Sequence, residues 1–273
     1  MSASSPAVAG GGAAPAAEPY AFATIHASSV PVFSGGFPAA AVAAVLASRP
    51  FLEWSASLDA RFSVRSITLQ SVDFFGPRVG FSKIVCDATF SGQRVPGVVF
   101  LRGGAVSVLP LLTCGRDWWI LCARQPRLAV GAHFLELPAG MIDDAGSFVG
   151  VAAKELKEET GIEIGIHELV DLTGLAYEGA PAPARGMYPS VGACDEFLRL
   201  FFFEREVDAE YLADLHGKLT GAADEDENIT LCLVRYEDAW RATADSKVIA
   251  SIGLLEKLVR TGRVTLRSGP LPE

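Results

Sequence analysis

Hydrophobic and polar residues are distributed along the first third of this chain in a pattern that predicts one helix and several strands. Residues 38–47, rich in Ala and Val, predict a short helix. Three apolar runs, at 66–72, 79–90 and 95–100, predict β-strands separated by turns that contain Gly. These strands would form a small antiparallel sheet ahead of the main domain.

The rest of the chain predicts a larger sheet with few helices. Strands are expected at 105–112, 118–123, 196–203 and 229–234, and helices at 147–160 and 239–260. Gly161 is expected to end the first of these helices, because glycine readily adopts the left-handed conformation past a helix end. Few helices around a central sheet favour an α+β sandwich over a doubly wound parallel sheet.

The same pattern divides the chain into four parts. Residues 1–19 are mainly Ala, Gly, Ser and Pro and predict a disordered tail, 20–100 an N-terminal extension, 101–265 the main domain, and 266–273 a flexible C-terminus. The first arginine is Arg49, and the tail lacks both a basic start and a dense apolar stretch. We therefore expect a cytoplasmic protein rather than a secreted or imported one.

Composition narrows the classes of protein further. Hydrophobic residues make up 50% of the chain and charged residues 20%, which are the proportions of a soluble globular protein, and no apolar run approaches the roughly 20 residues that a bilayer needs. With 23 basic and 32 acidic residues, the net charge of −9 argues against nucleic-acid binding. The cysteines have no metal-ligand spacing and predict buried thiols in a reducing compartment: Cys86, Cys114, Cys122, Cys194 and Cys232.

Three glutamates provide the clearest candidate chemistry. Glu155, Glu158 and Glu159 lie at i, i+3 and i+4 of a predicted helix, so one helix face carries three carboxylates. One interpretation is a solvated helix face, where Lys154 and Lys157 dilute the negative charge. The other is a divalent-cation site, because Mg²⁺ prefers carboxylate oxygen and tolerates clustered acids.

The glutamates belong to a longer pattern that resembles the Nudix box. The matching positions are Gly140, Glu155, Leu156, Glu158, Glu159, Gly161 and Ile162. The sequence departs from the box at Gly146, where the box has Glu, and at Lys154, where it has Arg. The resemblance implies a hydrolase that cleaves a nucleoside diphosphate linked to another group. It also implies the Nudix α/β/α sandwich, here with an N-terminal antiparallel β-sheet extension.

Neighbouring segments narrow the resemblance to the ADP-sugar branch of that superfamily. Residues 135–142 (LELPAGMI) resemble the lead-in of ADP-ribose and ADP-sugar pyrophosphatases, and residues 221–229 (GAADEDENI) resemble their acidic loop. From about residue 72 to 258 the chain is most similar to the plant plastid ADP-sugar diphosphatases. The resemblance implies a homodimer that hydrolyses ADP-ribose or ADP-glucose to AMP and a sugar phosphate, and it leaves a plastid location open.

The resemblance further implies a metal site. Its ligands would be Glu155, Glu158, Glu159 and the backbone carbonyl of Ala139. They would hold Mg²⁺, with Mn²⁺ able to substitute, and the cation would polarise the phosphoryl oxygens and lower the pKa of a coordinated water.

Catalytic and substrate-binding roles follow from the same resemblance. Glu225 or Glu227 would take the proton from water, with Glu158 a further catalytic residue. Arg127 would contact a phosphate or the terminal ribose, and Glu136 would assist at the substrate or the metal. The plainer interpretations are a solvated acidic loop, a surface arginine and a polar residue at a strand edge.

Two rival functions stay open on the sequence. A Nudix hydrolase of this kind could act on a dinucleotide cofactor or an oxidised nucleotide instead of an ADP-sugar. The altered residues Gly146 and Lys154 would also suit a catalytically silent nucleotide-sugar sensor. The sugar preference and the attacked phosphorus depend on the shape of the site, which the sequence does not give.

Overall fold

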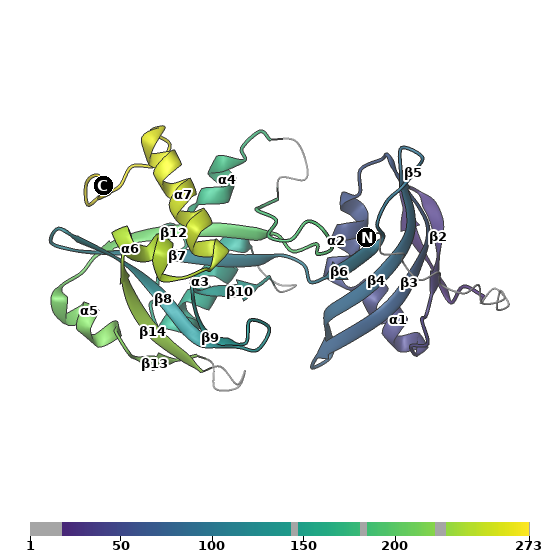
Figure 1. Cartoon of the computed structure of the whole chain (residues 1–273), viewed down its shortest axis with the longest axis horizontal. Helices are drawn as coiled ribbons and strands as arrows, with labels where there is room; N and C mark the ends of the chain where they lie inside the picture. The colour runs from purple at the N-terminus through teal and green to yellow at the C-terminus, as the bar shows by residue number, and fades with distance from the viewer. Residues whose placement is uncertain (1–17, 143–146, 181–184, 222–227, 273) are drawn as a thin grey trace, which may run out of the picture. The chain divides into compact units, whose positions relative to one another are not determined.

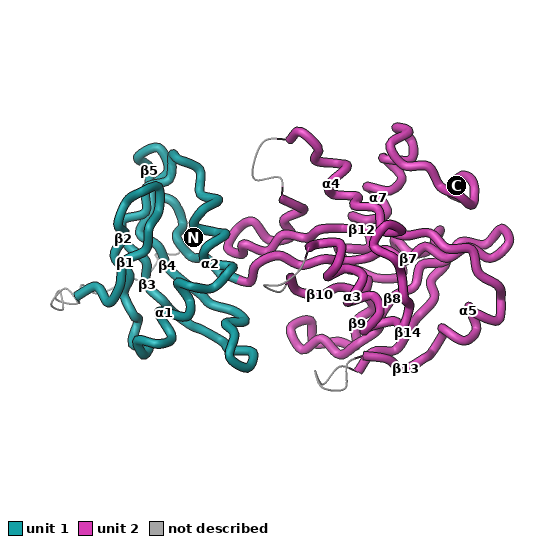
Figure 2. The backbone as a smooth tube through the Cα atoms, turned by 180° about the vertical axis from the view of Figure 1, so that it is seen from behind, with its two compact units in different colours: residues 1–101 teal, residues 102–273 magenta. Residues whose placement is uncertain are grey.

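The computed structural model describes residues 18–142, 147–180, 185–221 and 228–272. The chain separates into two compact units, residues 1–101 and residues 102–273 (Figure 2). Each unit has its own sheet and its own hydrophobic core. The predicted tail falls almost wholly outside the described residues, as do Gly146, Glu225 and Glu227.

The N-terminal unit is a six-stranded sheet with two helices (Figure 1). Its elements are β1 (Ala21–Ile25), β2 (Ser28–Phe33), α1 (Ala39–Ala47), α2 (Arg49–Ser57), β3 (Phe62–Phe75), β4 (Arg78–Phe90), β5 (Gln93–Arg94) and β6 (Val98–Leu101). The strand order is β1-β2-β3-β4-β5, and β6 pairs with β4. All of these pairings are antiparallel except that of β2 with β3, which is parallel. The predicted antiparallel sheet therefore contains one parallel pair, because the helical crossover of α1 and α2 joins its two strands.

Alternation along the strands builds the core of this unit. In β4, Ile84, Cys86 and Ala88 are buried, while the residues between them are partly exposed. Val42 and Val45 of α1 bury against the same cluster. One face of the sheet is thus covered by its own crossover helices.

The C-terminal unit is an eight-stranded sheet with helices on both faces. Its elements are β7 (Ala105–Cys114), β8 (Asp117–Arg127), β9 (Ala132–Glu136), β10 (Ala139–Met141), α3 (Phe148–Thr160), β11 (Val170–Asp171), α4 (Leu172–Ala176), β12 (Leu198–Glu206), α5 (Ala209–Leu215), β13 (Leu219–Thr220), β14 (Ile229–Arg235), α6 (Tyr236–Ala242) and α7 (Ser246–Arg260). The strand order is β11-β12-β7-β8-β14-β13, with β10 paired to β7 and β9 to β8. Strands β12 and β7 are parallel.

Two core clusters lie on opposite faces of this sheet. One contains Leu109 and Leu111 of β7 together with residues of α4, α6 and α7. The other contains Val108 and Leu112 of β7 together with residues of α3 and α5. Figure 1 shows α4 and α7 on one side of the sheet and α3 on the other. The arrangement is an α/β/α sandwich, and the predicted α+β class is confirmed.

The structure also corrects one prediction about the cysteines. All five are free thiols, but Cys86 and Cys122 alone are buried and the other three are half-buried. Burial raises the pKa of the Cys86 thiol to about 12, which makes it a poor nucleophile near neutral pH. Among the described residues, no helix is long and apolar enough to cross a membrane.

Candidate active site

The segment between β9 and β10 carries the chain from one strand of the sheet to the next. Glu136, the last residue of β9, pairs with Ala123 of β8, whereas Ala139, the first residue of β10, pairs with Ser107 of β7. The carbonyl of Pro138 accepts hydrogen bonds from the Ser107 hydroxyl and from the backbone of β7, both at 3.0 Å. The predicted residues Glu136 and Ala139 are therefore held at the ends of a short, tightly bound crossing.

Helix α3 packs beside this crossing and has defined ends. Ser147 begins it, with a hydroxyl that accepts from the backbone N–H of Gly150 at 3.1 Å. Gly161 ends it at a φ of 75°, the left-handed conformation that its position predicts. Between these ends, Val151 and Leu156 bury against the sheet and fix the rotation of the helix.

Two of the three α3 glutamates face strand β10. A Cβ atom added to Gly140 would lie 1.8 Å from the carboxyl carbon of Glu155, so this carboxylate occupies the space that a side chain at 140 would need. Glu159 is 2% exposed, and its Oε2 accepts from the backbone N–H of Ala139 at 3.3 Å. The close approach of the Glu155 carboxylate explains why this position of the box, Gly140, has a glycine.

Glu158 pairs with a lysine one turn earlier on the same helix. Its carboxylate lies 3.4 Å from the Lys154 ammonium, and both side chains are substantially exposed. Within the described residues, no three His, Cys, Asp or Glu side chains already converge as a metal cage. The donors that do meet at β10 are carboxylate and backbone oxygens, a set that fits a hard cation such as Mg²⁺. Glu158 would have to leave Lys154 to join them.

Glu136 is the centre of a buried network of charges. It is 7% exposed, its Oε1 accepts from Arg127 Nε at 2.6 Å, and its Oε2 accepts from Lys247 Nζ at 3.0 Å. Lys247 also donates to Asp245 Oδ1 at 3.0 Å. Burial disfavours the ammonium, but the charges of Asp245 and Glu136 outweigh that cost and raise the pKa of Lys247. The sum of these four charges is zero, and Arg127 is the exposed end of the network.

Sequence reasoning missed Thr243, Asp245 and Lys247 as parts of the site. Asp245 begins α7 and accepts from the backbone N–H of Lys247 at 3.0 Å, so an aspartate directly before an apolar periodic segment was the available signal. That signal predicts a helix start. It does not predict that the helix start lies beside Glu136.

The proposed general bases lie outside the described residues, but the strand before them is described. The Thr220 hydroxyl, at the end of β13, donates to the carbonyl of Glu159. The chain therefore enters residues 222–227 from a point beside the end of α3.

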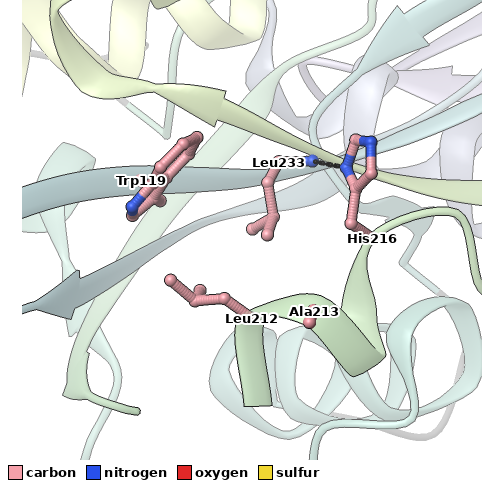
Figure 3. Close-up of a pocket in the computed structure, with 5 residues that line it drawn as sticks. All are labelled: Trp119, Leu212, Ala213, His216 and Leu233. Carbon is pink, nitrogen blue, oxygen red and sulfur yellow. Dashed lines mark hydrogen bonds between the residues drawn. The ribbon is translucent and has the colours of Figure 1, made fainter. Parts of the chain in front are cut away.

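Two cavities lined by described residues lie away from this site. One, of about 320 Å³, lies between α5 and strands β8 and β14, and is lined by Trp119, Leu212, Ala213, His216 and Leu233 (Figure 3). Two of these lining residues are joined, because the backbone N–H of Leu233 donates to His216 Nδ1 at 3.3 Å (Figure 3). Another, of about 410 Å³, lies between α6 and α7. Of the predicted site residues that the structure describes, none lines either cavity.

Comparisons with known proteins bear on the same residues. A family model described as NUDIX domain matches residues 101–252, more than half of the chain. Nudix hydrolase 14, chloroplastic, of Arabidopsis thaliana is 41% identical over 210 residues, which cover 76% of this chain and 67% of the relative. An uncharacterized Nudix hydrolase of Schizosaccharomyces pombe is 33% identical over 73 residues, 27% of this chain and 34% of the relative. A solved structure described as the crystal structure of ADP compounds hydrolase aligns at a TM-score of 0.43 and 20% identity, covering 74% of this chain and 99% of that chain.

Proposed function

Because this chain belongs to the Nudix family, as its box predicted, we propose that it hydrolyses the pyrophosphate linkage of an ADP-sugar. The substrate would be ADP-ribose or ADP-glucose, and the products AMP and a sugar phosphate. The observation that carries the proposal is the meeting of Glu155 and Glu159 with the Ala139–Gly140 backbone. The LELPAGMI segment that surrounds this backbone supplies the preference for ADP-sugars, on sequence resemblance.

The proposed cofactor is Mg²⁺, with Mn²⁺ as a substitute. Glu155, Glu158, Glu159 and the carbonyl of Ala139 would hold it. When bound, such a cation neutralises diphosphate charge and makes water a better nucleophile. Glu155 and Glu159 already lie at β10, so the chain positions two of these ligands through the packing of α3.

Arg127 is the proposed contact for the substrate's phosphate or terminal ribose. Its Nε donates to Glu136, which orients the planar guanidinium, and its side chain is 43% exposed. The two terminal nitrogens of the same plane can then bind two oxygens at once. Glu136 acts in this proposal by holding Arg127 rather than by reacting itself.

Glu225 or Glu227 is the proposed general base. Either carboxylate would take the proton of the attacking water, a role that typically contributes about a hundred- to ten-thousand-fold in rate. The bond from Thr220 to the Glu159 carbonyl supports this role, because it brings the entry to residues 222–227 beside α3. Replacing Glu225 and Glu227 singly by Gln should identify the base through the larger loss of turnover.

The decisive experiment is hydrolysis of ADP-ribose and ADP-glucose with and without Mg²⁺. Chromatography should find AMP and sugar phosphate in the presence of metal, and neither product after chelation. A dinucleotide cofactor and an oxidised nucleotide, tested in parallel, should react much more slowly. Preference for one of these would replace the proposed substrate. Binding of an ADP-sugar without turnover in any condition would make the chain a sensor.

Two further proposals concern assembly and location. We propose a homodimer, for which sedimentation should give twice the mass of 28.8 kDa. For location we propose the cytoplasm. The printed name of the Arabidopsis relative makes a plastid the alternative. Imaging a fusion that carries a fluorescent protein at its C-terminus distinguishes the two compartments.

A further inference from the structure

The connection between α6 and α7 holds the backbone on both sides of Glu136. The Thr243 hydroxyl donates to the carbonyl of Leu135, and Asp245 Oδ2 accepts from the N–H of Leu137 at 3.0 Å. Thr243 and Asp245 are themselves joined, because the N–H of Asp245 donates to Thr243 Oγ1 at 3.1 Å. We call these two residues the clasp.

The clasp requires a carboxylate at 245. Asp245 is 4% exposed, and its two oxygens accept from three donors: the N–H of Leu137, the N–H of Lys247 and the Lys247 ammonium. An amide at this position would place its own N–H₂ against at least one of these donors. Helix capping alone would not need this, since Asn caps a helix as well as Asp does.

The clasp also reaches the side chain of Glu136. Lys247 is 14% exposed and links Asp245 Oδ1 to Glu136 Oε2, while Glu136 Oε1 holds Arg127. Hydrogen bonds from the clasp therefore hold the backbone of the residues before and after Glu136. Ion pairs with Arg127 and Lys247 hold the two oxygens of its carboxylate. Arg127, at 43% exposure, is the end of this chain of contacts that a substrate can meet.

We propose that Thr243 and Asp245 are positioning residues that orient Arg127, through Glu136, for the diphosphate of the substrate. The inference rests on the proposed function, because it takes Arg127 as the contact for substrate. Neither clasp residue touches the reacting atoms. Loss of the clasp should therefore weaken substrate binding while the proton transfer and the α3 carboxylates stay as they are.

The first test is Thr243→Val, which keeps the side-chain shape and removes the hydroxyl. The substitution removes the bond to the Leu135 carbonyl and the bond from the Asp245 N–H, and we expect KM for ADP-ribose to rise about fivefold, with kcat nearly unchanged. Thr243→Ser should restore the KM. Thr261→Val is the matched control: this threonine lies past the other end of α7 and donates to the Lys257 carbonyl at 2.9 Å. It should leave both constants unchanged.

Asp245→Asn provides the stronger perturbation and should raise KM more than Thr243→Val. If it fails to fold, Thr243→Val decides alone. A fall in kcat with KM at the parental value would overturn the proposal, and so would equal effects of Thr243→Val and Thr261→Val.

A crystal structure of Thr243→Val separates this inference from the proposed function. We expect the Arg127 Nε to Glu136 Oε1 contact, 2.6 Å in the parent, to lengthen beyond hydrogen-bond distance or to become disordered. An unchanged contact overturns the positioning role, whatever the substrate. If the parent hydrolyses no ADP-sugar, the proposed function fails, and the crystal structure still decides whether the clasp positions Arg127.

Discussion

Two groups of acidic side chains lie on either side of the β9–β10 crossing, and they differ in what they contact. Glu136 and Asp245 are buried and share Lys247, and Arg127 completes a set of charges that sums to zero. On α3, Glu155 and Glu159 turn to the backbone of β10. On the same helix Lys154 pairs with Glu158, and Lys157 pairs with Glu163 beyond the helix end.

The contrast indicates that the group around Lys247 supports the structure, whereas Glu155 and Glu159 form the candidate metal-binding surface. A carboxylate that is buried with cations from its own chain is fully compensated, and removing one partner leaves an uncompensated buried charge. Carboxylates gathered against a strand backbone, as Glu155 and Glu159 are at β10, are the kind of donors that suit a divalent cation. Removing the buried cation of the first group, Lys247, should therefore reduce stability most, and removing a carboxylate of the second group should reduce turnover most.

The largest expected effect is on stability, from Lys247→Met. The substitution keeps the apolar stem but leaves Glu136 and Asp245 buried together without the ammonium. We expect the free energy of unfolding to fall by about 3 kcal/mol or more, as measured by urea denaturation. Lys157→Met is the matched control, because its pair with Glu163 is largely exposed, and it should lower the free energy of unfolding far less than Lys247→Met does.

The effect of Lys247→Met should also depend on pH. Since the folded protein raises the pKa of Lys247, the stability that its charge contributes is complete below about pH 10.5, the ordinary lysine value. It is lost as the pH rises through the raised value. The difference in stability between the parent and Lys247→Met should therefore shrink above pH 10.5. A difference that stays constant in alkali would show that packing, not charge, produces it.

Glu159→Gln should have the largest effect on turnover. If Glu159 holds a metal ion, kcat for an ADP-sugar should fall at least a hundredfold, or about 2.7 kcal/mol in barrier. The loss of unfolding free energy should be small, because the amide can still accept from the N–H of Ala139. Glu163→Gln, past the end of the same helix, should retain parental rates. Near-parental turnover in Glu159→Gln would remove this residue from the site.

Gly140→Ala tests whether Glu155 must lie over the strand. The new methyl group would occupy the position of the Glu155 carboxylate, so either the side chain or β10 must move. We expect kcat to fall about tenfold, or about 1.4 kcal/mol in barrier, with the fold retained by circular dichroism. Gly253→Ala is the control, since a methyl group on this residue of α7 meets nothing within 4 Å. It should be as active as the parent and equally or more stable.

The smallest effect is expected from Lys154→Ala, which removes the partner of Glu158. Both side chains are exposed, so thermal unfolding should reveal a change of no more than about 0.5 kcal/mol. Turnover should stay near the parental rate. A loss as large as that of Glu159→Gln would place Lys154 in the site, and the departure from the box at this position would then be functional.

Most of the secondary structure near the site could be predicted, because it depends on local periodicity. The helix expected at 147–160 is Phe148–Thr160, and Gly161 has the positive φ that its position required. The long strands β7, β8, β12 and β14 also follow from their apolar runs. Strand β10, by contrast, has three residues, and only its pairing with β7 makes it a strand.

The sequence by itself determined the family, the α+β class and the presence of three carboxylates on one turn of helix. Those features follow from residue identity and from spacings that the backbone geometry of a helix or strand translates directly into position. Tertiary structure alone decided that Glu155 and Glu159 face β10, because the burial of Val151 and Leu156 sets the rotation of α3. It alone also brought Lys247 to Glu136, 111 residues away, since packing of α7 on the sheet creates that contact and no local pattern encodes it.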